Sequence, residues 1–309
     1  MSQLSLPRGL SRRRFIQLAG GASGAIAVGC ATSEESPSLT PEAKTEKGFV
    51  QPLGGDLLLE MIEVPAGEFL MGSPEDEADR TAGERPRHRV TAPAFYMGKY
   101  PVTQAQWQAV ANLSRVERKL KLNPSYFKGD NRPVEKVSWD EAVEFCKRLS
   151  RHTGEKYHLP SEAQWEYACR AGTTTPFYFG ETISTEQANY NGDYAYDTYG
   201  NRKKGQYRRK TTEVGIFPAN AFGLYDMHGN VWEWCEDFWH SNYEGAPTDG
   251  SAWIEGGELD VRPLRGGAWS VWPSGCRSAY RVRGYLDNRS NGNRSNMIGF
   301  RVCCSAPFA

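Results

Sequence analysis

Alternating apolar and polar positions predict strands at the start of the folded part of the chain. Residues Leu57–Pro65 pass from an apolar run into alternation, and Gly67–Gly72 alternate as well. Successive side chains of a strand point to opposite faces, so this pattern is typical of strands with one buried face. We expect a hairpin that turns at 65–67, another strand over Val90–Tyr100, and strands within 262–302 that close a small core.

Three helix starts are predicted by capping boxes, in which a Ser or Thr and a Glu or Gln three residues later satisfy each other's backbone amides. They pair Thr103 with Gln106, Ser138 with Glu141, and Ser161 with Gln164. After the second box, apolar residues recur on one face, which predicts an amphipathic helix from about Trp139 to His152. Cys146 lies on that face, so we expect it to be a core residue.

The first 55 residues differ in composition from the rest. Residues 1–29 contain Arg12-Arg13 followed by a short apolar run that is too brief to span a bilayer, which is typical of a twin-arginine export signal. Small residues before Cys30 indicate lipidation of that cysteine, and an ordinary cleavable signal is the alternative. Residues 30–55 then form a disordered tether, 56–305 form one domain, and lipid on Cys30 is the only expected membrane contact. The predicted location is outside the cytoplasm, in the periplasm or at the cell surface.

Composition narrows the class of protein. The chain has 309 residues with 32 Gly, 18 Pro and 9 Trp, which favours a loop-rich globule over a helical bundle. Its formal net charge is +0, so no basic footprint indicates nucleic acid as a partner. The five histidines lack the spacing of zinc sites, and neither a phosphate-binding glycine loop nor a GxSxG motif occurs.

One stretch, Phe222–Trp239, concentrates aromatic rings, two glycines and four carboxylates, and has few long aliphatic residues. Within it, GLYDMHGNVWEW resembles the signature of the formylglycine-generating enzyme (sulfatase-modifying factor) family, a variant of the C-type-lectin fold. LEMIEVPAGEFLMGS and SEAQWEYACRAG extend the resemblance over most of the chain. The resemblance implies an α+β fold, loop-rich, with short antiparallel strands and a few helices.

The resemblance also implies calcium, a hard cation that takes six to eight oxygen ligands. The alternative for the carboxylates of this segment is that they cap turns. The implied ligands of a first ion are the side chains of Asp226 and Glu233 with the carbonyls of Gly229 and Val231. A second ion would involve Asn189 and Tyr190, with Asp197 as a guess for its acidic ligand.

Copper is the second cofactor that the family uses, held as Cu⁺ by two thiolates of a motif that follows Arg-Gly-Gly-Ser. Here Arg265-Gly266-Gly267 is followed by Ala268, and Cys276 stands at the second cysteine position. Val271 stands at the first and offers no ligand atom. We therefore expect weak Cu⁺ binding and an incomplete site. Cys276 and Trp232, which matches a tryptophan of the family's oxygen pocket, are the candidate catalytic residues; for Trp232 the alternative is simple packing.

The remaining cysteines have no fixed pairing from sequence alone. The resemblance implies a disulfide from Cys169 to Cys303 or Cys304, in an exported compartment that permits disulfides. Basic residues of the C-terminal third, among them Arg277, Arg281 and Arg301, are expected to pair with carboxylates more often than to line a groove.

Two functions follow as hypotheses. The first is an enzyme that oxidises or tailors an exported polypeptide or peptide natural product. The second is a non-catalytic, calcium-stabilised lectin-like module. Its surface around Asn189–Lys210 and Asp287–Asn296 would hold a cell-envelope protein or glycan.

Overall fold

The computed structural model describes residues 47–194, 204–286 and 294–305. The predicted export signal, Cys30, most of the tether, Asp197 and residues 287–293 lie outside the described residues. Within these three ranges, no helix is long and apolar enough to cross a membrane.

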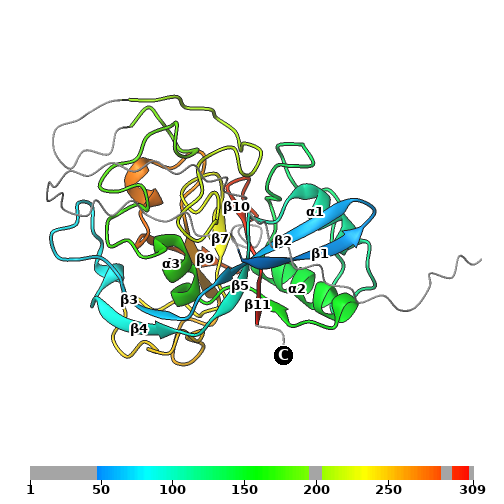
Figure 1. The fold of residues 1–309 in the computed structure, drawn as a ribbon, viewed down its shortest axis with the longest axis horizontal. Helices are drawn as coiled ribbons and strands as arrows, with labels where there is room; N and C mark the ends of the chain where they lie inside the picture. The colour runs from blue at the N-terminus through cyan, green and yellow to red at the C-terminus, as the bar shows by residue number, and fades with distance from the viewer. Residues whose placement is uncertain (1–46, 195–203, 287–293, 306–309) are drawn as a thin grey trace, which may run out of the picture.

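Short strands and three helices make up the described fold (Figure 1). The helices are α1 (Gln104–Ala111), α2 (Trp139–Thr153) and α3 (Glu162–Arg170), with 3₁₀ turns η1 (Ala82–Glu84) and η2 (Pro273–Cys276). The strands are β1 (Gly48–Gly54), β2 (Leu57–Val64), β3 (Gly67–Met71), β4 (His88–Ala92), β5 (Phe95–Gly98), β6 (Tyr157–His158), β7 (Trp232–Trp234), β8 (Val261–Arg265), β9 (Arg281–Tyr285), β10 (Ile298–Gly299) and β11 (Cys303–Ser305). The predicted loop-rich α+β fold is confirmed.

The strands form three sheets. One has the order β1-β2-β5-β11-β6, the second β10-β7-β8-β9, and the third pairs β3 with β4. All pairs are antiparallel except β10 with β7, which is parallel. The first and last strands of the described residues, β1 and β11, both belong to the largest sheet, in which β11 lies between β5 and β6.

The predicted hairpin is wrong in its pairing. Strand β2 pairs with β1 and β5, whereas β3 pairs with β4, so the turn at 65–67 links two different sheets. Alternation indicates that a strand has a buried face, but it does not select the neighbouring strand. Strand β1 lies before Asp56, the expected start of the domain, and it buries Phe49 against the core.

The sequence also predicted one strand where the structure has two, on either side of Pro93. The expected strand over Val90–Tyr100 is two strands, β4 and β5, which belong to different sheets. Proline has no backbone N–H and cannot continue a hydrogen-bonded ladder, so the chain leaves one sheet here and enters the other.

The three capping boxes are confirmed. The side chains of Thr103, Ser138 and Ser161 each accept a hydrogen bond from the amide three residues later, at 3.3, 3.3 and 3.0 Å. Helix α2 is followed by its C-cap Gly154, whose left-handed conformation (φ 81°) terminates the helix. The predicted span of α2 is therefore correct to within one residue at its end.

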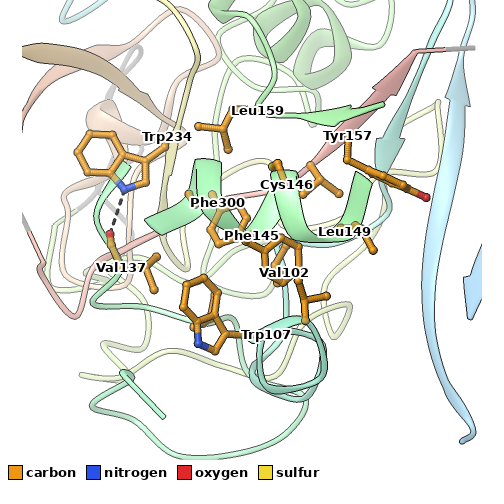
Figure 2. Close-up of a cluster of buried hydrophobic side chains, with 14 of the residues drawn as sticks. Val102, Trp107, Val137, Phe145, Cys146, Leu149, Tyr157, Leu159, Trp234 and Phe300 are labelled. Atoms are coloured by element: carbon orange, nitrogen blue, oxygen red, sulfur yellow. Dashed lines mark hydrogen bonds between the residues drawn. The ribbon is translucent and has the colours of Figure 1, made fainter. Parts of the chain in front are cut away.

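Helix α2 packs its apolar face into the main core (Figure 2). Phe145 stacks on Trp107 of α1 at a centroid distance of 5.7 Å and meets Phe300 edge to face at 5.2 Å. Cys146 is buried in the same cluster, which confirms it as a core residue. Trp234 of β7 donates its indole N–H to the carbonyl of Val137 at 3.1 Å. This bond ties β7, the end of the signature segment, to the start of α2.

Candidate functional site

The segment Phe222–Trp239 combines a tight turn with the buried strand β7. Asp226 and Asn230 have left-handed backbones, with φ of 55° and 65°, and Gly229 has φ of 78°. A Cβ atom on Gly229 would lie 2.4 Å from the carbonyl oxygen of Asn189, so glycine alone permits this approach. The turn therefore places Asn189, a predicted ligand of the second ion, against residues predicted for the first.

Glu233 forms a buried ion pair. Its Oε2 accepts hydrogen bonds from Arg301 Nε at 2.6 Å and from the Trp165 indole at 2.7 Å, and its Oε1 accepts from the second nitrogen of Arg301 at 2.8 Å. All three side chains are inaccessible or nearly so. Because arginine already engages both oxygens, the predicted role of Glu233 as a calcium ligand does not fit this arrangement.

Asp226 has the opposite environment. Its Oδ2 accepts from the backbone amide of Gly215 at 2.7 Å, while Oδ1 is buried and has no hydrogen-bond partner within the described residues. Burial raises the pKa of Asp226 to about 6. A buried carboxylate oxygen without a donor is costly unless a cation or water meets it. Asp226 therefore fits the predicted calcium role.

The other predicted ligands also divide into those with an open oxygen and those whose oxygen already has a hydrogen-bond partner. The buried Oδ1 of Asn189 also lacks a partner in the described part of the chain. The Tyr190 hydroxyl donates to the carbonyl of Ile183 at 3.2 Å, and the carbonyl of Gly229 accepts from the amide of Val231 at 2.9 Å. Across residues 47–194, 204–286 and 294–305, no group of three or more His, Cys, Asp or Glu is arranged to hold a metal. Calcium thus fits at the two side chains with open oxygens.

Cys276 ends η2 and faces the interior. Its side chain is inaccessible and packs with Phe177, Ile183 and Tyr190, and its thiol lies 3.9 Å from the carbonyl of Trp272. Burial raises the pKa of the thiol to about 12. The thiolate is the form that binds soft metals or attacks substrates, so this cysteine is chemically quiet at neutral pH.

Trp232 belongs to the main core cluster, whereas Cys276 packs in a separate buried cluster. Trp232 is 7 % exposed, and its ring centroid is 6.1 Å from that of Tyr280, which is half-buried. Val271 is half-buried as well and packs on the main core cluster to which Trp232 belongs. Trp272, the next residue, is 53 % exposed. The two candidate catalytic residues are therefore both buried, in two different clusters.

Comparison with known proteins gives the family. A family model described as the sulfatase-modifying factor enzyme 1-like domain matches residues 51–306, which is most of the chain. The chain belongs to the formylglycine-generating enzyme family.

Relatives within the formylglycine-generating enzyme family carry diverse names. The chain is 31% identical over 287 residues to a serine/threonine-protein kinase pkn1 of Chlamydia caviae, covering 86% of this chain but only 41% of that protein. It is 33% identical to the chaperone protein LppX of Paenibacillus barcinonensis, covering 58% of this chain and 71% of that protein. The solved structure of PvdO from Pseudomonas aeruginosa has a TM-score of 0.69 and 35% identity, covering 85% of this chain and 100% of that one.

The cysteine pairing implied by the formylglycine-generating enzyme family is wrong for this structure. Cys169 and Cys303 are buried free thiols. The thiol of Cys169 lies 3.6 Å from the Ser278 hydroxyl and 3.9 Å from Nδ1 of His228. Cys169 therefore packs against a serine and a histidine instead of forming a disulfide.

The arginine prediction is confirmed, and the structure supplies partners that the sequence did not identify. Arg277 pairs with Glu84 at 2.7 Å and with Glu77, while Arg281 pairs with Glu162 at 2.6 Å. The carboxylates stand more than a hundred residues before their arginines, so no local spacing relates them. Where the spacing is four residues, as between Glu144 and Arg148 of α2, helical geometry would have predicted the pair.

Proposed function

We propose that this protein is an exported, copper-independent member of the formylglycine-generating enzyme family that binds an exported polypeptide or peptide. The observation that carries the proposal is the inaccessible Cys276, whose raised pKa keeps it a thiol while Val271 stands at the position of its partner. A single buried thiol provides no two-sulfur site for Cu⁺. Two aromatic residues close to Cys276 in the sequence, Trp272 and Tyr280, are partly exposed.

Two further observations support binding as the activity. The relative LppX is named as a chaperone protein. Aromatic side chains that are partly exposed, such as Trp272 and Tyr280, supply the buried contact area on which polypeptide recognition depends. We also propose that the twin-arginine signal exports the chain and that lipid on Cys30 anchors it outside the cytoplasm.

Calcium belongs to the proposal as a structural ion. Asp226 would contribute its open oxygen to the first predicted ion, which would offset the buried charge of the carboxylate, and Asn189 would contribute its own to the second. No step of binding requires the ion to contact the polypeptide.

The test uses the purified full chain, an array of 15-residue peptides of broad composition, and a Cys-x-Pro-x-Arg peptide incubated with Cu⁺. We expect a subset of the array to bind and mass spectrometry to find no aldehyde in the Cys-x-Pro-x-Arg peptide. Val271→Cys is the matched variant, because it supplies a second sulfur of similar volume and should strengthen Cu⁺ binding. Aldehyde formed by the parent protein and lost in Cys276→Ser would overturn the proposal, as would an array on which nothing binds.

A second candidate function is oxidation or other tailoring of the bound polypeptide. It is favoured by the position of Trp232, whose ring centroid lies 6.1 Å from that of the half-buried Tyr280. Mass spectrometry of the array peptides that bind, before and after incubation, decides between the two. A mass change that requires the protein would establish tailoring.

A further inference from the structure

Four aromatic residues from three separate loops form a continuous row, which we call the aromatic row: Tyr126, Phe127, Trp269 and Tyr207. Tyr126 and Phe127 meet edge to face at 5.0 Å, Phe127 and Trp269 meet edge to face at 5.4 Å, and Trp269 and Tyr207 lie nearly parallel at 6.2 Å. Tyr126 is 64% exposed, and the other three rings are half-buried. A line of partly exposed rings is unusual on a surface without a partner.

Hydrogen bonds to neighbouring segments hold the three loops in place. The amide of Phe127 donates to the buried carboxylate of Glu135 at 2.8 Å, and the indole of Trp269 donates to the carbonyl of Asn296 at 3.1 Å. A further bond joins the two loops that carry Phe127 and Tyr207, since Val214 donates to the Asn131 carbonyl at 2.9 Å. The row is therefore preformed, which lowers the entropy cost of binding.

Basic residues flank two members of the aromatic row, Tyr207 and Phe127, in the sequence. The segment Lys204–Lys210 contains four basic residues and no acidic one, although the whole chain has a net charge of +0. The guanidinium of Arg209 lies 5.1 Å from the centroid of the Tyr207 ring. Arg209 and Lys210 are exposed, as is Lys128 beside Phe127. The local potential thus favours an anionic partner.

We propose that the aromatic row is a docking surface for an acidic polypeptide segment. The inference rests on the proposed function and names the chemistry of the polypeptide that is bound. Tyrosine, tryptophan and arginine are the residue types that carry most binding energy in protein interfaces, and all three occur here. The edge-to-face pairs offer alternating edges and faces, which suit inserted side chains better than the successive parallel faces that stack nucleic-acid bases.

The experiment measures binding of the purified full chain to a fluorescent poly(Glu,Tyr) copolymer by anisotropy, at several salt concentrations. Poly(Lys), polygalacturonate and an oligo(dT) strand serve as probes of the other partner classes. We expect poly(Glu,Tyr) to bind most tightly and its affinity to fall as salt rises, because exposed charges are screened.

The variant Tyr126→Ala with Arg209→Asn removes one exposed ring and one exposed charge from the surface. Asparagine suits position 209 because the backbone there is left-handed, with φ of 59°. We expect at least a tenfold loss of affinity. The matched control is Tyr285→Ala with Arg283→Asn, an exposed pair whose guanidinium lies 5.5 Å from the ring centroid and next to Trp239, and it should bind as the parent does.

Each other outcome has a definite meaning. Equal loss in both variants, or no loss in either, would overturn the assignment of the surface. Tighter binding of polygalacturonate or oligo(dT) would show that the partner is a glycan or a nucleic acid. Peptide-array binding with no preference for acidic sequences would contradict this inference but leave the proposed function intact. An array on which no peptide binds would contradict both.

Discussion

Buried carboxylates in this protein have opposite properties, depending on which donors surround them. Glu233 lies against the guanidinium of Arg301 in a buried ion pair. Glu135 has only the Phe127 amide on one oxygen, and its Oε2 has no hydrogen-bond partner within the described residues. Burial raises the pKa of Glu135 to about 7. The same side-chain type therefore pairs with arginine in one place and is left with an open oxygen and a raised pKa in the other.

Glu135→Gln should change how the stability of the protein depends on pH. Between pH 4.5 and about 7 the folded protein holds a proton on Glu135 that the unfolded chain has lost, so this group lowers stability as pH rises. Glutamine does not titrate. We expect the stability of Glu135→Gln relative to the parent to increase from pH 5 to pH 8, by on the order of 2 kcal/mol.

Urea denaturation at several pH values between 5 and 8 measures this difference. Glu213→Gln, which changes an exposed carboxyl, is the control and should follow the pH dependence of the parent. Parallel pH curves for Glu135→Gln and the parent would contradict the prediction.

Helix α2 illustrates how an element is fixed by both of its ends. The hydroxyl of its N-cap Ser138 accepts a hydrogen bond from the amide of Glu141. In turn, the Glu141 carboxylate accepts from the amide of Ser138 at 2.9 Å. Between the ends, Phe145 and Leu149 supply the apolar face that the core requires. Local bonds thus set the start of the helix, and burial keeps it in place.

Ser138→Ala should therefore lower the free energy of unfolding by about 1 kcal/mol, since it removes the capping oxygen. Ser138→Gly is the matched variant, because glycine at an N-cap costs only a few tenths of a kcal/mol. Thermal or urea denaturation of the three proteins gives the comparison. A glycine variant that is as unstable as the alanine variant would point to packing, and not capping, as the role of Ser138.

At the scale of the whole molecule, long-range contacts bring the two ends of the domain to the signature segment. Arg301 precedes β11 and reaches Glu233 in β7, while Trp165 of α3 contacts the same carboxylate. Asp226 lies near this pair but keeps one oxygen open. Charge neutralisation by arginine at Glu233 and by the proposed calcium ion at Asp226 would be two separate contributions to stability.

Chelation separates the two contributions. We expect EGTA to lower the melting temperature of the parent, since an ion at a hundredfold excess over its dissociation constant stabilises the folded state by about 2.7 kcal/mol. Asp226→Asn should abolish the effect of EGTA. Glu233→Gln should instead lower stability by about 3–5 kcal/mol in calcium and in EGTA alike, because it leaves Arg301 buried without a counter-charge. Identical melting of the parent in both buffers would exclude the calcium ion.

Features that depend on neighbouring residues were determined by the sequence itself. The capping boxes place three helices because each box is a contact across three residues. The signature segment identifies the family, and Val271 in place of a cysteine follows from the order of residues alone.

Contacts between distant segments were decided only by the tertiary structure. Alternation predicted β2 but not its partner β1, because a pattern of side chains specifies a buried face and not a neighbour. The signature suggested Glu233 as a metal ligand, yet Arg301, 68 residues later, occupies both of its oxygens. The burial of Cys276 and the joining of three loops in the aromatic row likewise depend on packing, which no local pattern encodes.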